Sequence, residues 1–350
     1  RYHPGVRLGN GLRVMVDATS FRVSVRVPAT HPAPQVVATV RRAERAGFAG
    51  AWLPDSPLNY REVWATLGAV AISTETIQLG PTVTNLVSRH PTVTAAAART
   101  VAEIAPGRVI LGIGSGDSAI GFDGMRPSSA RGVIAGVTRI RTLLQGGAVE
   151  YGSFSASLRG ADSHVPIYVA ASGPRLLHGV GQVADAGIVT PGRLTEKLAA
   201  VAAGAAQAKR APPPVYVYGM CAVTDDVEQT SRLLKPVALR LAQLEGVAAF
   251  AQAGVRIDVP EHTAGAEGDV GHAEDFAQAA RALDGLVSDE AALWVARNRA
   301  IVGTESEVVA QLKALREQGA AGIAISQISG NRLPDELIEA VGPLLRELAG

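Results

Sequence analysis

The chain has 350 residues, which exceeds an ordinary domain but suits a single barrel of alternating strands and helices. Its 33 Lys and Arg residues balance 32 Asp and Glu residues, and no basic run is interleaved with aromatic residues, so we expect no nucleic-acid partner. The single cysteine, Cys221, excludes an internal disulfide, and no apolar run approaches the roughly 18 residues of a membrane helix. These features predict a cytoplasmic protein without a membrane partner.

Strand and helix patterns alternate along the chain. Short apolar, β-branched runs predict strands at 22–27, 48–53, 76–83, 109–113, 166–170, 187–190, 215–223 and 322–326. Helical patterns occupy 35–46, 61–72, 92–104, 130–144, 304–318 and 334–348. One further helix starts near 174, and another ends near 209. Thr304 and Glu307 match a capping box. Cys221 is expected to be buried in strand 215–223.

The strand at 109–113 has a site-like end. Its run has no period-2 alternation, which is typical of a parallel strand buried on both faces. It leads into Gly112, Gly114 and Gly116, where a ligand could approach bare backbone amides. Asp117 and Ser118 then place a carboxylate and a hydroxyl beside those amides.

Between 225 and 303 the alternation lapses into mostly helical patterning with a polar break at 258–271. We interpret this stretch as a helical insertion between strands 7 and 8, near the barrel mouth. The predicted fold is therefore an α/β (β/α)8 TIM barrel, with residues 1–350 forming one domain. A doubly wound sheet with Gly112 to Gly116 as a dinucleotide fingerprint is less favoured, because the spacing is Gly-x-Gly-x-Gly and the following residues resemble a loop.

In such a barrel the carboxyl ends of the strands meet on one face, which brings together Asp55, 82–85, 114–118 and 171–175. These strand ends carry carboxylates, small hydroxyls, many bare amides and one arginine, but no histidine. That composition suits a planar polar cofactor better than a metal, so we expect no metal site. Asp55 and Asp117 could instead be ordinary helix or turn caps. Ser172-Gly173 fits either an ordinary helix start or an anion-binding site at a helix N-terminus.

Five stretches together resemble the luciferase-like superfamily of flavin- and deazaflavin-dependent oxidoreductases. They are Leu-Pro-Asp-Ser (53–56), Leu-Gly-Pro-Thr-Val-Thr-Asn (79–85), Arg-His-Pro (89–91), Leu-Gly-Ile-Gly-Ser-Gly-Asp-Ser-Ala (111–119) and Ala-Ala-Ser-Gly-Pro (170–174). Among the branches of this superfamily, the chain is most similar to the enzymes that resemble methylenetetrahydromethanopterin reductase. The similarity covers roughly 23–223 and the last barrel unit.

The resemblance implies a barrel that binds coenzyme F420 or FMN at its strand ends and forms a homodimer. It also implies a cis peptide bond at Thr82–Val83, against the cofactor ring. Asp55 would contact the cofactor head, Asn85 the ring region, and the backbone of Ser172 and Gly173 the tail. The full set of expected cofactor contacts is Asp55, Thr82, Val83, Asn85, Gly114, Ser115, Gly116, Ala171, Ser172, Gly173, Arg175 and Arg193.

Two departures from the family pattern concern acid–base chemistry. Several deazaflavin enzymes of this group carry Asp-His at the second strand end, where this chain has Asp55-Ser56. A related member has Glu after the fourth-strand glycines, where this chain has Asp117. Oxidation of a sugar phosphate like that member's is therefore not expected, and Asp117 is the candidate catalytic residue.

The resemblance implies an oxidoreductase that transfers a hydride between coenzyme F420 and a small organic substrate. The alternative is an FMN-dependent monooxygenase that uses reduced flavin and oxygen, and a third interpretation is a flavin-binding barrel without turnover. Arg175, Arg193 and Lys197 could contact the longer acidic tail of coenzyme F420, which favours the deazaflavin.

Overall fold

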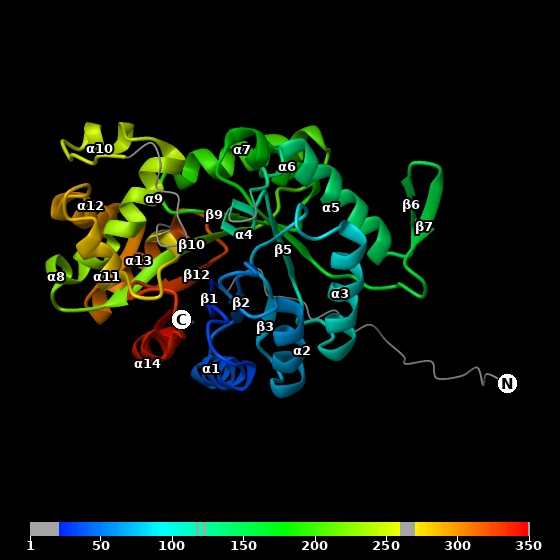
Figure 1. Ribbon diagram of the computed structural model, residues 1–350, viewed down its shortest axis with the longest axis horizontal. Coiled ribbons are helices and arrows are strands. Elements are labelled where there is room, and N and C mark those ends of the chain that lie inside the picture. Colours follow the sequence, from blue (N-terminus) through cyan, green and yellow to red (C-terminus); the bar gives the residue numbers. More distant parts are fainter. Residues whose placement is uncertain (1–20, 117, 122–123, 260–269, 349–350) are drawn as a thin grey trace.

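The computed structural model describes residues 21–116, 118–121, 124–259 and 270–348, which form a parallel sheet surrounded by helices (Figure 1). The sheet order is β3-β2-β1-β12-β10-β9-β8-β5-β4, with β11 paired to β10. Its strands are β1 (Arg22–Arg26), β2 (Gly50–Leu53), β3 (Gln78–Pro81), β4 (Thr84–Asn85), β5 (Leu111–Gly114), β8 (Ile167–Ala170), β9 (Ala186–Val189), β10 (Val215–Val223), β11 (Ala300–Gly303) and β12 (Gly322–Gln327).

The two ends of this sheet meet. β3 lies within the third predicted strand, 76–83, and β4 directly follows it. β4 pairs with β5, and a parallel bridge joins Leu79 of β3 to Val109 just before β5. The sheet therefore nearly closes on itself, and the predicted TIM-barrel-like α/β fold is confirmed. Every residue of β2, β5, β9 and β12 is buried, as expected for strands covered on both faces.

Helices cover the outside of the sheet. Following the chain, they are α1 (Ala33–Ala46), α2 (Val63–Ser73), α3 (Pro91–Ile104), α4 (Ser118–Gly121), α5 (Ala130–Leu144), α6 (Pro174–Val183), α7 (Leu194–Gln207), α13 (Glu305–Glu317), α14 (Asp335–Val341), the 3-10 turn η3 (Gly342–Leu344) and α15 (Leu345–Leu348). The capping box predicted from Thr304 and Glu307 is present at the start of α13. Across the described ranges, no helix has both the length and the apolar character that crossing a bilayer requires.

The stretch predicted as an insertion is mostly helical but ends in a strand. It contains α8 (Val227–Ser231), η1 (Arg232–Leu234), α9 (Lys235–Glu245), α10 (Ala248–Gln252), η2 (Val270–His272), α11 (Phe276–Ala282) and α12 (Asp289–Arg299). Its last four residues form β11, which pairs in parallel with β10 and so belongs to the sheet. The sequence pattern missed β11 because it follows α12 without an intervening loop.

Two other local predictions differ from the structure. The residues after the glycine loop were expected to be irregular, but they begin with one helical turn, α4, which the fully buried Ile120 anchors. Residues 148–157, where no strand is predicted, form a two-stranded antiparallel hairpin, β6 (Ala148–Tyr151) and β7 (Phe154–Ser157), that pairs separately from the main sheet.

An aromatic cluster fills the inside of the barrel. Trp52 packs edge-on against Tyr168 and Tyr216, at centroid distances of 6.0 and 5.8 Å, while the two tyrosine rings stack at 5.4 Å. The next residues along these strands, such as Ala51 and Leu53, belong to the larger aliphatic core that includes residues of the outer helices. The alternation follows from the two-residue period of a strand.

Glycines allow α6 and α7 to approach closely. A Cβ atom built on Gly181 would overlap the carbonyl oxygen of Val201, and one built on Gly204 would overlap the carbonyl oxygen of His178. In contrast, a Cβ on Gly68 in α2 would meet nothing within 4 Å. The α6–α7 contact therefore requires glycine at its crossing point, whereas α2 tolerates a side chain.

We predict opposite effects for two glycine-to-alanine substitutions in helices. Gly181→Ala should lower the free energy of unfolding by about 1–3 kcal/mol, because the methyl group forces the two helices apart. Gly68→Ala should raise it by about 0.5–1 kcal/mol through helix propensity. Chemical denaturation measures both changes, and a Gly181→Ala protein as stable as the parent would contradict the close-packing interpretation.

Cys221 is buried within β10, where its side chain is 1% exposed. Burial raises the pKa of its thiol to about 12, so the thiol stays protonated and unreactive at pH 8. We expect no reaction with a disulfide reagent such as DTNB in the native protein, and one equivalent after unfolding in guanidinium chloride. Rapid labelling of the native protein at pH 8 would show that β10 opens or is misplaced.

Candidate functional site

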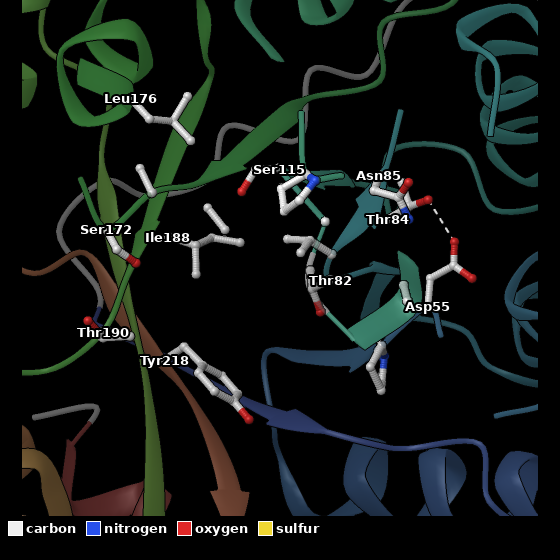
Figure 2. Close-up of a pocket in the computed structure, with 18 of the residues that line it drawn as sticks. Asp55, Thr82, Thr84, Asn85, Ser115, Ser172, Leu176, Ile188, Thr190 and Tyr218 are labelled. Atoms are coloured by element: carbon white, nitrogen blue, oxygen red, sulfur yellow. Dashed lines mark hydrogen bonds between the residues drawn. The ribbon is translucent and has the colours of Figure 1, made fainter. Parts of the chain in front are cut away.

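A cavity of about 950 Å³ opens at the carboxyl ends of the strands (Figure 2). Eleven of the twelve residues expected to contact a cofactor line it, although they come from four separate parts of the chain. They are Asp55, Thr82, Val83, Asn85, Gly114, Ser115, Gly116, Ala171, Ser172, Gly173 and Arg175. The expected catalytic residue, Asp117, lies outside the described residues, but its neighbour Gly116 lines the cavity.

The third strand bulges into this cavity between β3 and β4. The peptide bond Thr82–Val83 is cis, as the sequence resemblance implied. A Cβ atom on Gly112 would lie 2.9 Å from Cγ2 of Thr82, and one on Gly114 would lie 2.8 Å from Cγ2 of Val83. The glycines of β5 therefore make room for the bulge as well as exposing backbone, and the two segments together form one wall of the cavity.

Asp55 is buried behind this wall and its carboxylate is already occupied. Oδ2 accepts hydrogen bonds from Nε of Arg89 at 2.6 Å and from Oγ1 of Thr84 at 2.7 Å, and Oδ1 accepts from Arg89 at 3.0 Å (Figure 2 shows the Thr84 contact). Burial acts to lower the pKa of Arg89, but Asp55 and Glu62 outweigh it and raise that pKa. Asp55 thus holds β4 and the following loop in place.

Asp55 does not cap the next helix, which was the simpler interpretation of its position. The N-cap of α2 is Glu62, whose side chain accepts a hydrogen bond from the amide of Ala65 at 2.6 Å. Asn85 also has a local role, because its Oδ1 accepts hydrogen bonds from the amides of Val87 and Ser88 at 2.9 and 2.8 Å. Both side chains line the cavity while organising the loop that leads to α3.

The opposite end of this wall is the start of α6. Gly173 is the N-cap, no side chain caps it, and Pro174 occupies the first turn. Ser172, Gly173 and Arg175 are exposed, and a Cβ on Gly173 would meet nothing within 4 Å. The N-terminus of α6 is thus accessible from the cavity, where its dipole favours a negatively charged group.

Of the three cations expected to meet an acidic cofactor tail, only Arg175 lines the cavity. Arg193 lies beyond the lining and pairs with the exposed Glu196 at 3.0 Å. Lys197 is buried, and its Nζ donates to the carbonyl oxygen and Oγ1 of Thr190 at 2.8 and 3.0 Å. Burial lowers the pKa of Lys197. Its two hydrogen bonds hold the Thr190 loop at the rim of the cavity.

A second wall, which the strand-end reasoning did not include, carries larger side chains. Arg26 closes β1, and its guanidinium donates to the hydroxyl of Tyr60 at 2.9 Å. Tyr218 of β10 and His272 of η2 also line this side. Arg26 could have been found from its place at the end of the first strand, whereas Tyr218 sits in mid-strand and no local signal marks it.

The model of the luciferase-like monooxygenase family matches residues 15–322 of this chain. The chain is 29% identical over 331 residues to 5,10-methylenetetrahydromethanopterin reductase of Methanolobus tindarius, with 89% of this chain and 95% of that protein covered.

Solved structures share the fold. The coenzyme F420 dependent tetrahydromethanopterin reductase from Methanopyrus kandleri superposes with a TM-score of 0.72 at 22% identity, over 95% of this chain and 99% of that one. A monooxygenase from Streptomyces bottropensis superposes with a TM-score of 0.63 at 19% identity, over 94% of this chain and 98% of that one.

We predict that Asp55→Asn lowers the free energy of unfolding by about 3 kcal/mol. This is the lower end of the cost of breaking a buried ion pair, because Arg89 keeps its contact with Glu62. The control is Glu62→Gln, which should cost no more than about 1 kcal/mol because that carboxylate is half exposed. Urea denaturation compares the two variants; equal effects would contradict the role given to Asp55.

Proposed function

The chain belongs to the luciferase-like monooxygenase family and is an oxidoreductase, and from this premise we propose that it transfers a hydride between coenzyme F420 and a small organic substrate. The observation that carries the proposal is the small-residue wall of the cavity, which runs from the Thr82–Val83 bulge to the N-terminus of α6. Family membership favours this enzyme over a binding protein without turnover.

The residues on this wall fit a flat cofactor with a phosphorylated tail. Gly114, Ala171 and Gly173 present little side-chain bulk, so a ring system can lie close to the backbone. The uncapped N-terminus of α6 suits the phosphate, and Arg175 suits further acidic groups beyond it. When bound, a deazaflavin supplies a centre that gives or accepts a hydride.

The chain's own groups would then position the reactants. Thr82 and Val83 would support one face of the ring, and the amides of Gly114 to Gly116 would donate hydrogen bonds along its edge. Asp117, one residue after Gly116, is the proposed proton-transfer residue, because Arg89 and Thr84 already occupy Asp55, the other acid at these strand ends. The homodimer and the cytoplasmic location that the sequence suggests stay predictions.

A second candidate is an FMN-dependent monooxygenase. The family description and the structural similarity to the Streptomyces bottropensis monooxygenase favour it. The similarity to the reductases of Methanolobus tindarius and Methanopyrus kandleri favours coenzyme F420, and the exposed Arg175 at the tail end adds a charge argument for the more acidic cofactor.

Anaerobic titration of the purified protein with coenzyme F420 and with FMN, followed by fluorescence quenching, tests the proposal. We expect tighter binding of coenzyme F420. Arg175→Glu should weaken its binding about tenfold by reversing a charge beside the tail, with a smaller effect on FMN. Arg193→Glu is the matched control and should change neither affinity appreciably, because Arg193 is outside the cavity.

Two results would change the assignment. Tighter binding of FMN than of coenzyme F420 would move the monooxygenase to first place, with oxygen consumption as the next assay. If neither cofactor binds, the proposed cofactor contacts lose their support.

A further inference from the structure

The two walls of the cavity differ in chemistry and lie on opposite sides of the barrel. In the sheet order, β12 is four steps from β5 in either direction, so the wall of β1, β12 and β10 faces the wall of β4, β5 and β8. The proposed cofactor wall consists of small residues. The facing wall carries Arg26, Tyr218 and His272, with Leu244 of α9 at its edge.

Strand register places Arg26 at the mouth side of this facing wall. Tyr218, Ala324 and Ser24 are aligned across β10, β12 and β1, so their side chains share one layer. Arg26 lies two residues beyond Ser24 on the same face of β1, and it is the register partner of Trp52 on β2. Arg26 therefore lies on the mouth side of the Tyr218 layer, level in the strand register with Trp52 of the aromatic cluster.

Arg26 has a charge that the described part of the protein does not balance. Among the described residues its one hydrogen bond is to the Tyr60 hydroxyl, over whose ring it also lies at 5.7 Å, and it forms no ion pair with a carboxylate there. Burial acts to lower the pKa of Arg26, but Tyr218 and Tyr60 raise it overall, so the group remains a cation. Four of its five N–H donors are left without a partner among those residues.

Two other arginines near the mouth are neutralised, whereas the exposed Arg175 lies at the proposed cofactor tail. Arg89 pairs with Asp55 and Glu62, and Arg299 pairs with Glu245 at 3.4 Å. Asp55 is the one carboxylate in the described lining of the cavity, and Arg89 and Thr84 already occupy it. A sheltered cation costs free energy unless an anion accompanies it, and a planar guanidinium binds a carboxylate through two parallel hydrogen bonds.

We propose that Arg26 determines substrate specificity and that the substrate is a small organic acid, whose carboxylate pairs with the Arg26 guanidinium. The apolar part of such an acid would lie along Tyr218, Ile188 and Leu244, facing the cofactor wall. The orientation of the substrate in this inference rests on the proposed function, which places the cofactor on the opposite wall. It concerns a different residue set from the cofactor contacts, so the two can fail separately.

Calorimetric titration with matched neutral probes tests the inference. Cinnamate and hexanoate are compared with cinnamamide and hexanamide, with the protein either free or saturated with coenzyme F420. We expect the parent protein to bind each acid about ten- to a hundredfold more tightly than its amide. Arg26→Met should abolish this preference, Arg26→Lys should keep part of it, and the exposed Arg41→Met on α1 should leave it unchanged.

Three outcomes would overturn the inference. The first is equal binding of acid and amide by the parent protein. The second is an unchanged preference in Arg26→Met, with native folding checked by circular dichroism. The third is a loss of coenzyme F420 affinity in Arg26→Met with no change in the acid-to-amide ratio, which would make Arg26 a cofactor contact.

Failure of the proposed function looks different. If neither coenzyme F420 nor FMN binds, but free protein prefers the acids and Arg26→Met does not, then the cofactor assignment is wrong while the role of Arg26 stands.

Discussion

The contact between the third strand and the glycines of β5 is the constraint on which the cavity depends. A Cβ on Gly80 would overlap the carbonyl oxygen of Ile110, and a Cβ on Gly112 would press against Thr82. Without side chains at these positions, the third strand can lie close to β5 through both β3 and β4, even where it bulges at Thr82–Val83. Closure of the barrel and the shape of the proposed cofactor wall thus have the same steric cause.

Charge is distributed unevenly around this cavity. Behind the bulge, Asp55 and Arg89 neutralise each other, and their hydrogen bonds fix β4 and the following loop. On the facing wall, Arg26 has phenol groups beside it and no carboxylate partner among the residues that the structure describes. The first arrangement is structural, since the ionic groups are mutually occupied, whereas the second leaves a cation available to a ligand.

The predicted insertion contains one element, the strand β11, that the local residue pattern did not predict. Its helical character follows from composition, and helices α8 to α12 occupy most of the described part of the stretch. However, β11 was absorbed into the predicted insertion, because a four-residue apolar run next to a helix has the same local pattern as the helix end. Pairing with β10 decides that it is a strand, and pairing is a long-range property.

The sequence by itself determined the alternation of strands and helices, the barrel, and the strand ends that line the cavity, including the cis bond at Thr82–Val83 that family resemblance implied. The alternation, the barrel and the converging strand ends follow from periodicity and from the rule that parallel strands end on one face, whereas the cis bond came from the resemblance alone. Only the tertiary structure decided which charged groups are free. From its place at a strand end Asp55 was expected to contact the cofactor, but its carboxylate is engaged by Arg89. Arg193 was expected to contact the cofactor tail, but it pairs with Glu196 outside the cavity. Arg26 was not among the expected site residues, but it lines the cavity and has no carboxylate partner in the described part of the chain. The reason is physical: local residue patterns predict backbone conformation, whereas the state of a charge depends on partners that folding brings from distant parts of the chain.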